Sequence, residues 1–500
     1  MWNIAHMTSK TSYNWIKPKK FDNNIIVIGG GSAGLVTTYI AAAVKAKVTL
    51  IEKHRMGGDC LNTGCVPSKA LISTTRLLAH ATRAKEFGIA KMTADYSFSD
   101  VMERVQAVIK TVAPHDSVER YENLGASVIE GNARILSPWE VEVTTKTGIQ
   151  ILTTLAIVIA AGARPLVPPI PGIEHIDYLT SDTVWNLRVQ PKRLIVLGGG
   201  PIGCELAQCF ARLGSHVTLV EMAPRLLIRE DIDASELVLE QFKKEGIAVC
   251  LGHTAKQFIV ENNEKTLLVE HEGKTIRIPF DAILLALGRT PNTSGYGLED
   301  IGVELSPKRT IQVDGFQATN YPNIFACGDV AGPYQFTHTA AHQAWYAAVN
   351  ALFGNIKKFR TDYSVIPWAT FTEPEVARVG LNEQEAHEQN IRYETSTYDL
   401  ADLDRAIADG NAHGFVKVLT SPGKDKILGV TIVGHHAGDL IAEFVLAMKH
   451  GIGLNKILET IHIYPTLAEA NKYVAGIWKK NHQPEKILEW VACYHAWRRG

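Results

Sequence analysis

The sequence predicts an α/β fold made of two successive βαβ units and a C-terminal α+β domain. Three observations predict this fold. A strand followed by a glycine-rich turn begins at Ile25, the same pattern returns at Leu194, and β-rich runs without that pattern begin near residue 356. Because 500 residues exceed one ordinary hydrophobic core, we expect two to four domains.

The composition is that of a soluble globular protein, with 46% hydrophobic and 21% charged residues. The formal net charge of −1 gives no global field that would favour nucleic acid or an acidic membrane surface. Seven cysteines are too few for a secreted disulfide scaffold of this length. The N-terminus lacks a signal-peptide pattern, so we expect a cytoplasmic protein.

The first βαβ unit starts with an apolar strand at 25–28 and closes with a second strand at 47–52. Residues 25–44 carry almost no charge and are long enough to span a membrane. We reject a membrane span because the glycines between 29 and 34 divide the stretch into strand, turn and helix, and a β-branched strand follows.

The second unit repeats the first, with strands at 194–197 and 216–221. In both copies an acidic residue, Glu52 or Glu221, stands at the same spacing from the first glycine. A GxGxxG turn between a strand and a helix, with such an acid, predicts a Rossmann-like dinucleotide site in which backbone N–H groups meet the pyrophosphate and the acid binds a ribose. Two copies at equal spacing disfavour glycines kept for packing alone. The glycines are Gly29, Gly31 and Gly34 in the first turn and Gly198, Gly200 and Gly203 in the second.

The remaining patterns place the other elements. Residues 71–124 read as mostly helical and 135–159 as strands. The endings 160–165 and 286–291 each carry a glycine, Gly162 or Gly288, and predict a crossing between domains. Residues 321–329 predict a short strand that ends in an exposed acid, Asp329. The C-terminal domain is predicted to have strands at 415–419 and 427–433 and an apolar helix at 440–449.

Two cysteines, Cys60 and Cys65, lie with four residues between them just after the first βαβ unit. A thiol pair beside a dinucleotide site indicates electron transfer between a nucleotide cofactor and sulfur, and therefore a redox enzyme. The alternative is two buried structural thiols. Cys204, Cys209, Cys250 and Cys327 lie in apolar contexts and are expected to be inert core residues.

These motifs, with a Gly328-Asp329 segment and a C-terminal Pro-Thr-x-x-Glu, resemble the flavoprotein pyridine nucleotide–disulfide oxidoreductases. That family includes dihydrolipoamide dehydrogenase, glutathione reductase and mercuric reductase, and the resemblance covers about residues 22–480. It implies an N-terminal extension (1–21), an FAD-binding domain in two parts (22–165 and 293–355), an NAD(P)-binding domain (166–292) and a C-terminal dimerisation domain (356–500).

The resemblance implies FAD on the first repeat, with Glu52 on the adenosine ribose and Asp329 on the ribityl chain. A nicotinamide nucleotide would occupy the second repeat. The dimerisation domain would form a homodimer in which the partner chain completes each active site.

The chemistry implied by the resemblance runs from NAD(P)H through the flavin to a Cys60–Cys65 disulfide. Cys65 would be the thiolate next to the flavin, and Cys60 would exchange with substrate. A helix N-terminus would lower the thiolate pKa in such a site. Lys69 would lie near the flavin and pair with Glu205, stabilising negative charge on the reduced flavin.

One position departs from the family pattern. In its disulfide reductases a histidine before the Pro-Thr acts as general acid and base, and a glutamate orients it. Here the glutamate is present as Glu469, but the histidine position holds Tyr464. With an ordinary pKa near ~10, tyrosine is a poor proton shuttle at neutral pH. His462 could take over the role only if the backbone repositions it; otherwise it packs or has a secondary role.

The acid at Glu221 favours NAD(H), because it would repel the 2′-phosphate of NADP(H). Arg225, four residues later, keeps NADP(H) open.

We therefore predict an NAD(P)H-dependent FAD enzyme that reduces a disulfide-like or thiophilic metal acceptor, as mercuric reductases do. Mercuric reductases usually carry a vicinal C-terminal cysteine pair, whereas this chain has only Cys493 near its end. The alternatives are a dihydrolipoamide dehydrogenase and a flavin-bound thiol redox sensor. No resident metal site is predicted. The C-terminal aromatic residues, Trp490, Tyr494 and Trp497, either line the active site or seal the dimer, and packing is favoured.

Overall fold

The computed structural model describes residues 15–500, so most of the predicted N-terminal extension lies outside the described residues. The described chain forms two compact units. The first comprises 15–66, 107–164 and 289–361, and the second comprises 67–106, 165–288 and 362–500. The chain passes between them after Arg164 and after Gly288, which confirms the predicted crossing segments. The predicted limits of the individual domains stay a prediction.

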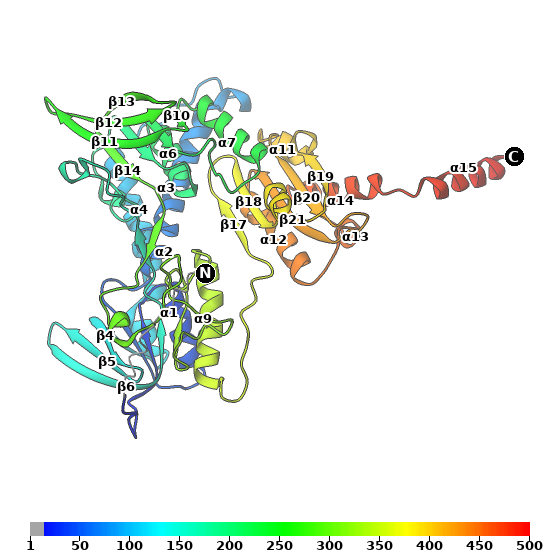
Figure 1. Cartoon of the computed structure of the whole chain (residues 1–500). Helices are drawn as coiled ribbons and strands as arrows, with labels where there is room; N and C mark the ends of the chain where they lie inside the picture. The colour runs from blue at the N-terminus through cyan, green and yellow to red at the C-terminus, as the bar shows by residue number, and fades with distance from the viewer. Residues whose placement is uncertain (1–14) are drawn as a thin grey trace, which may run out of the picture. The chain divides into compact units, whose positions relative to one another are not determined.

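The first unit is built on a seven-stranded sheet in the order β3-β2-β1-β6-β5-β4, with β16 paired to β6. Strands β1, β2, β3 and β16 run parallel to their neighbours, and β4 and β5 form antiparallel pairs. The strands are β1 (Asn23–Ile28), β2 (Val48–Glu52), β3 (Ser127–Glu130), β4 (Asn132–Ser137), β5 (Glu140–Thr145), β6 (Gly148–Ile159) and β16 (Ile324–Ala326). Helices α1 (Ser32–Ala43) and α9 (Thr337–Phe353) lie beside each other on this sheet (Figure 1).

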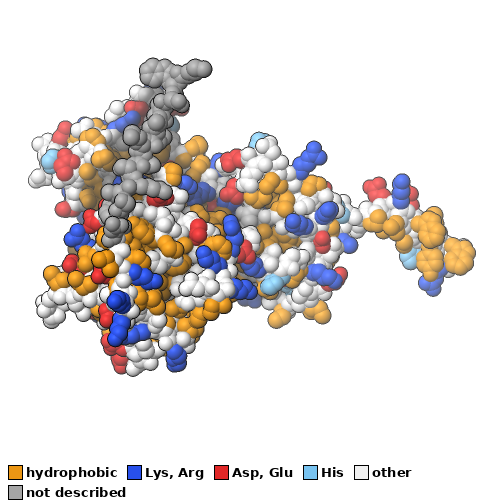
Figure 2. Space-filling view, turned by 60° about the horizontal axis from the view of Figure 1, so that its bottom comes forward, with side chains coloured by type: hydrophobic (Ala, Val, Ile, Leu, Met, Phe, Trp, Pro, Cys, Tyr) orange, Lys and Arg blue, Asp and Glu red, His pale blue; other side chains and the backbone are white. Residues whose placement is uncertain are grey.

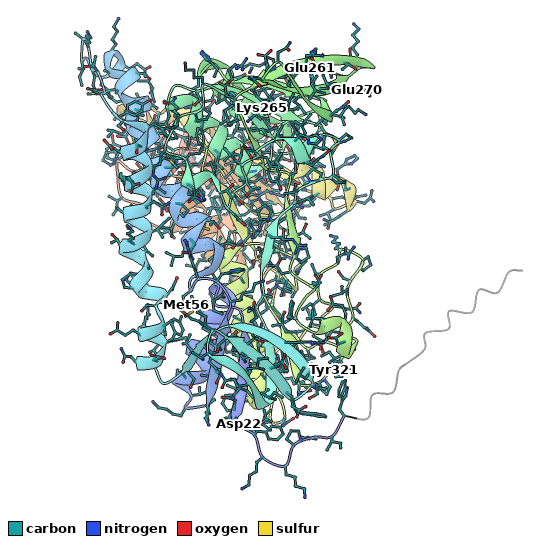
Figure 3. The ribbon with its side chains drawn as sticks, turned by 90° about the vertical axis from the view of Figure 1, so that its left-hand side faces the viewer. Asp22, Met56, Glu261, Lys265, Glu270 and Tyr321 are labelled. Atoms are coloured by element: carbon teal, nitrogen blue, oxygen red, sulfur yellow. The ribbon has the colours of Figure 1, made fainter. Side chains whose placement is uncertain are left out.

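Both faces of this sheet are buried, which explains why the central strand β1 reads as a continuous apolar run. On one face Ile25 and Val27 pack with residues of α1 and α9. On the other face Ile26 and Ile28 pack with side chains such as Ile135. Asp22 and Tyr321, labelled in Figure 3, lie at the start of β1 and shortly before β16.

The second βαβ unit forms a four-stranded parallel sheet in the order β10-β9-β8-β14. Its elements are β8 (Arg193–Leu197), α6 (Pro201–Arg212), β9 (His216–Glu221), α7 (Ile232–Lys244), β10 (Ala248–Leu251) and β14 (Ala282–Leu285). An antiparallel sheet is inserted before β14, made of β11 (Thr254–Glu261), β12 (Glu264–His271) and β13 (Lys274–Phe280). Glu261, Lys265 and Glu270 mark this sheet in Figure 3.

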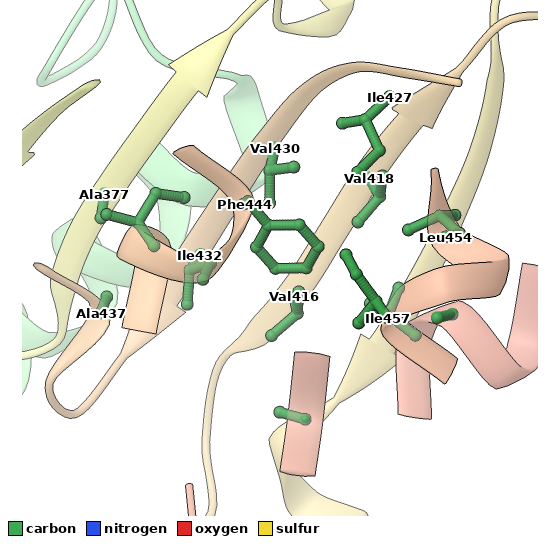
Figure 4. Packing of buried hydrophobic residues seen from close by; sticks show 14 of the residues in the cluster. Ala377, Val416, Val418, Ile427, Val430, Ile432, Ala437, Phe444, Leu454 and Ile457 are labelled. Atoms are coloured by element: carbon green, nitrogen blue, oxygen red, sulfur yellow. The ribbon is translucent and has the colours of Figure 1, made fainter. Parts of the chain in front are cut away.

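The C-terminal domain is a five-stranded antiparallel sheet in the order β17-β18-β21-β20-β19. Its strands are β17 (Pro367–Thr370), β18 (Glu375–Gly380), β19 (Glu394–Asp399), β20 (Phe415–Thr420) and β21 (Ile427–Gly434). The two predicted strands and the apolar helix, α12 (Ala437–Lys449), are confirmed to within a few residues. Phe444 of α12 packs over Val416 and Val430 in a fully buried core (Figure 4).

The other elements are short or connect the sheets. The short strands β7 (Ala163–Pro165) and β15 (Arg289–Pro291) pair with each other. The remaining helices are α2 (Gly58–Asn62), α3 (Cys65–Thr82), α4 (Phe98–Val112), α5 (Val118–Asn123), α8 (Leu298–Ile301), α10 (Glu383–Glu388), α11 (Asp404–Ala408), α13 (Leu454–Glu459), α14 (Glu469–Asn481) and α15 (Glu485–Arg499). Among residues 15–500, no helix is both long and apolar enough to cross a membrane. The uncharged stretch from Ile25 is instead β1, a turn and α1, as predicted.

Candidate active site

The two glycine-rich turns have the same local geometry. Gly29 and Gly198 both adopt positive φ, at 107° and 112°. A Cβ on Gly34 would lie 1.8 Å from the carbonyl oxygen of Gly29, and a Cβ on Gly203 would lie 1.9 Å from that of Gly198. Since neither distance is sterically possible, the third glycine of each motif lets helix and strand approach closely.

The acid that ends the second strand reaches back to its own glycine turn in both copies. Glu52 accepts hydrogen bonds from the backbone N–H of Gly30 at 2.5 Å and of His54 at 2.6 Å. Glu221 accepts them from Gly199 at 2.5 Å and Ala223 at 2.7 Å. Each carboxylate is thereby held at the carboxyl end of its strand, beside the glycine turn at the N-terminus of the preceding helix, α1 or α6. This is where the ribose of a dinucleotide binds in such folds.

The predicted thiol pair lies at the junction of the short helix α2 and the long helix α3. Cys60 is in α2, Cys65 is the first residue of α3, and both are free thiols in the structure. The hydroxyl of Thr337, the first residue of α9, lies 3.5 Å from the Cys65 sulfur. The positive ends of α3 and α9 therefore both lie at the thiols, which favours negative charge on sulfur.

The two thiols interact directly. A hydrogen bond with Cys65 raises the pKa of Cys60, and burial and the negative charge of Asp116 raise it further. A hydrogen bond with Thr337 acts in the opposite direction and lowers it.

Asp329 is not the exposed acid that the sequence predicted, since its side chain is only 20% exposed. Burial raises the pKa of Asp329, and the nearby guanidinium of Arg289, with Nε at 3.4 Å from Oδ2, partly offsets that increase. Arg289 also pairs with Asp59 in α2 and donates to the carbonyl of Ala163. The sequence could not show this burial, because the segments that cover Asp329 lie far apart in the sequence.

The two glycines at the predicted crossing segments, Gly162 and Gly288, precede the strands β7 and β15, and both adopt positive φ.

Lys69 and Glu205 form the pair expected from the family pattern. The Lys69 Nζ lies 2.8 Å from Glu205 Oε2, and the Glu205 side chain is only 7% exposed. Glu205 Oε1 also accepts the backbone N–H of Phe371 at 2.9 Å, and the ammonium lies 4.3 Å above the Phe371 ring. These contacts fix the cation one helical turn after Cys65.

The hydroxyl of Tyr464 is hydrogen-bonded to a residue other than Glu469, although the family pattern links those two positions. It donates to Asp404 Oδ2 at 3.0 Å, and this bond is the main cause that raises the pKa of Tyr464. Glu469 instead accepts from the backbone N–H of Thr466 at 3.2 Å and the hydroxyl of Tyr473 at 3.1 Å.

His462 is packed, one of the two outcomes left open by the sequence. Its Nε2 lies 2.9 Å from Glu443 Oε1 and its Nδ1 lies 3.1 Å from the carbonyl of Thr460. The side chain is 7% exposed, so a proton-transfer role would require the loop to move.

Three of the four cysteines expected in the core, Cys204, Cys209 and Cys327, are buried, and burial raises the pKa of each. The fourth, Cys250, is only partly buried. Within residues 15–500, no group of three or more metal-binding side chains is placed to hold an ion.

Sequence reasoning missed two residues that contact predicted site residues: Thr337, beside Cys65, and Asp404, beside Tyr464. Neither belongs to a motif, and each lies far in sequence from the side chain that it contacts. The tyrosine in place of histidine at position 464 was the available signal, since a hydroxyl group there needs a hydrogen-bond partner of its own.

Comparison with known proteins accords with this geometry. Residues 23–344 match the family described as pyridine nucleotide-disulphide oxidoreductase, and residues 366–475 match its dimerisation domain. The chain is 34% identical to dihydrolipoyl dehydrogenase from Chlamydia pneumoniae, over 89% of this chain and 94% of that protein. It is 33% identical to mercuric reductase from Bacillus cereus, over 92% of this chain and 72% of that protein.

Solved structures give a similar result. The Cu(II) complex of the HOCl-induced flavoprotein disulfide reductase RclA from Escherichia coli has a TM-score of 0.81 and 26% identity, covering 91% of this chain and 99% of that one. LpdA from Mycobacterium tuberculosis has a TM-score of 0.82 and 26% identity, covering 90% and 99%.

Proposed function

Because this chain belongs to the pyridine nucleotide-disulphide oxidoreductase family of flavoprotein enzymes, we propose that it passes electrons from NADH through FAD to a Cys60–Cys65 disulfide. From there the electrons go to a thiophilic metal ion or a disulfide-like acceptor. The observation that carries the choice of acceptor is the Tyr464–Asp404 hydrogen bond at the position of the family's proton-transfer histidine.

The first glycine turn and its acid fit FAD. The glycines of the turn after β1 bring no side chain of their own, and Glu52 is held at the end of β2. Asp329 is a mostly buried carboxylate with one cationic neighbour, a group suited to accept hydrogen bonds from a sugar-alcohol chain. When bound, FAD would take a hydride from the reduced nicotinamide and transfer two electrons to the Cys60–Cys65 disulfide.

The protein's own residues manage charge and protons around that transfer. Cleavage of the disulfide takes up two electrons and yields two thiolates, and the raised pKa of Cys60 favours uptake of a proton at that sulfur. The N-termini of α3 and α9 favour thiolate at Cys65. Lys69, fixed by Glu205, supplies a cation on the same helix.

The second half-reaction depends on the acceptor. A divalent ion such as Hg²⁺ takes two electrons to become the metal, and the thiols return to a disulfide and release two protons. A disulfide acceptor needs two electrons and two protons, because each departing thiolate must be protonated. With Tyr464 bonded to Asp404 and its pKa raised, the proton donor for that second case is weak, which favours a metal acceptor.

Dihydrolipoamide oxidation is the second candidate. Relatives named dihydrolipoyl dehydrogenase align over nearly their whole length, which supports it. Tyr464 counts against it, because a thiol–disulfide reaction requires efficient proton transfer. The third candidate is a redox sensor, in which the thiol pair would be reduced once and would not turn over.

NADH is favoured over NADPH by two contacts. Glu221 lies where a 2′-phosphate would have to bind, held by two backbone N–H groups. Arg225, the nearest alternative phosphate ligand in sequence, donates to the carbonyls of Ile228 and Glu230 and to Gln384. Its guanidinium is therefore already engaged.

A homodimer is proposed from the dimerisation domain. The loop before Pro465 carries two apolar side chains in solvent, Ile461 at 93% and Ile463 at 79% exposure. Such exposure of isoleucine is costly in a monomer, so burial of this loop against a partner chain is favoured. A cytoplasmic location stays a prediction from the sequence.

The test is an anaerobic titration of the FAD-loaded protein with NADH, followed by turnover with Hg²⁺, Cu²⁺, lipoamide and oxidised glutathione offered separately. Cu²⁺ is included because RclA was solved as a Cu(II) complex. We expect two electrons to reduce the thiol pair, read as two alkylatable cysteines by peptide mass, with a long-wavelength absorbance band that Cys65→Ser abolishes. Faster turnover with a metal ion than with either disulfide supports the proposal.

Other outcomes are equally decisive. Efficient turnover of lipoamide alone would assign the dihydrolipoamide dehydrogenase reaction. One stoichiometric reduction with no turnover of any acceptor would support the sensor. Reduction of the flavin with both cysteines unchanged would remove the thiol pair from the electron path.

A further inference from the structure

The C-terminal helix α15 presents an apolar face that nothing in residues 15–500 covers. Every residue of α15 is exposed, including Trp490 at 80% and Trp497 at 77%. Figure 1 draws α15 beyond the end of α14, clear of the five-stranded sheet, and Figure 2 has hydrophobic side chains gathered at its outer end. Backbone hydrogen bonds join α15 to Pro484 and Gly500, the residues on either side of it, and the ring contacts of Tyr494 are with His495 and Trp497 of the same helix.

Most of the large apolar residues of α15 form one stripe, and Leu488 lies outside it. Five of them recur at helical spacing and fall within an arc of about 120° at 3.6 residues per turn. This set, called the aromatic stripe below, is Ile487, Trp490, Val491, Tyr494 and Trp497. Large aromatic and β-branched side chains concentrated on one face and left in water mark an interaction surface.

The location of α15 indicates what covers the stripe. The match to the dimerisation domain ends at residue 475, inside α14, and α15 begins at Glu485, three residues after α14 and its cap. The helix is thus a direct continuation of the domain through which two copies of the chain associate.

The charges of α15 favour the same partner. Glu485, Lys486 and Glu489 give its N-terminal half a net charge of −1, and Arg498 and Arg499 make its C-terminal end basic. Two such helices in antiparallel orientation set the acidic end of one against the basic end of the other, as a two-fold symmetric interface requires. A helix that lies on an anionic membrane would instead be expected to carry basic residues along its whole polar face.

We propose that the aromatic stripe of α15 docks on a second copy of this chain and extends the dimer interface beyond the family's dimerisation domain. The inference rests on the homodimer proposed above. It assigns a role to a segment that the family match does not include.

The test compares dimer dissociation constants by sedimentation velocity of the FAD-loaded protein. The double variant Trp490→Glu/Trp497→Glu places charge on the stripe, and the chain ending at residue 482 removes α15 altogether. The matched control is Ala496→Glu, which adds charge to the opposite face of the same helix. We expect both stripe changes to weaken the dimer by at least about tenfold, since buried tryptophans dominate interface energies, and the control to leave it unchanged.

Because all three substituted side chains are exposed, FAD absorbance and thermal unfolding should match the wild type and verify the fold. Equal dimer strength in the stripe variants and the wild type would overturn this inference and leave the homodimer standing. A full chain that is monomeric at all concentrations would overturn both. Flotation of the full chain with phosphatidylcholine–phosphatidylglycerol vesicles, lost in the stripe variant, would assign the stripe to a membrane surface and overturn it as well.

Discussion

Tyr464 donates a hydrogen bond from its hydroxyl to the carboxylate of Asp404 at 3.0 Å. The contact joins the loop before α14 to the start of α11. It raises the pKa of a phenol that is already a weak acid at neutral pH. The position where disulfide reductases of the family keep a proton donor therefore holds a group that keeps its proton.

Replacement of Tyr464 by histidine should increase turnover of disulfide acceptors. An imidazole titrates near neutral pH, so Tyr464→His should raise the rate of NADH-dependent lipoamide or glutathione reduction by about tenfold to a hundredfold. Steady-state NADH oxidation measures it. Tyr464→Phe is the control and should leave disulfide turnover at the wild-type level. Abolition of disulfide turnover by Tyr464→Phe would contradict the interpretation of the phenol as a poor proton donor.

Substitution of the equivalent acids Glu52 and Glu221 should weaken the binding of a different cofactor in each case. Both hold the same pair of backbone N–H contacts, so Glu52→Ala and Glu221→Ala make the same local change in the two repeats. Loss of a charged ribose ligand costs about tenfold or more in affinity. Glu52→Ala should lower the FAD content of purified protein, read from absorbance, with little change in the KM for NADH.

Glu221→Ala should raise the KM for NADH at full FAD content. The ratio of kcat/KM for NADPH to kcat/KM for NADH should rise, because the carboxylate that repels the 2′-phosphate is removed. If the two variants changed the same cofactor, the assignment of one cofactor to each repeat would be wrong.

The reactivity of Cys60 should respond in opposite directions to its two neighbours. Only thiolate reacts with iodoacetamide, so a raised pKa moves the reaction to higher pH. Cys65→Ala removes the largest cause of the increase and should shift the pH profile of Cys60 alkylation to lower pH. Thr337→Val removes a contact that lowers the pKa and should shift the profile to higher pH.

Peptide mass spectrometry of the reduced protein over a pH series separates Cys60 from the other thiols. A shift in the same direction for both variants would show that the hydrogen bonds with Cys65 and Thr337 do not control Cys60.

The stability of the C-terminal domain should depend on the buried ring of Phe444. The ring is fully buried among β-branched residues such as Val416 and Ile432 (Figure 4). Phe444→Ala leaves a cavity and should lower the free energy of unfolding by about 3–5 kcal/mol, measured by urea denaturation. Phe444→Leu keeps most of the volume and should cost less than about 1.5 kcal/mol. Similar costs for both changes would mean that the site collapses around the smaller side chain.

Much of this protein could be predicted from local sequence. The strand β1, the turn after it and α1 follow from an apolar run, glycines and a second apolar run, all within neighbouring residues. The cysteine box is equally local, and so is the pattern that places Glu52 and Glu221 at strand ends. The Lys69–Glu205 pair was expected only from the family resemblance, and the structure shows it.

The tertiary structure alone decided the contacts between residues that lie far apart in the sequence. Asp329 was expected in solvent, but its partner Arg289 and the surrounding backbone cover most of it. Thr337 reaches Cys65 only because α9 begins beside α3, and Asp404 reaches Tyr464 only because the C-terminal sheet brings their loops together. Sequence periodicity predicts which face of a helix or strand is buried. The packing of the whole domain decides which side chain of another element contacts that face.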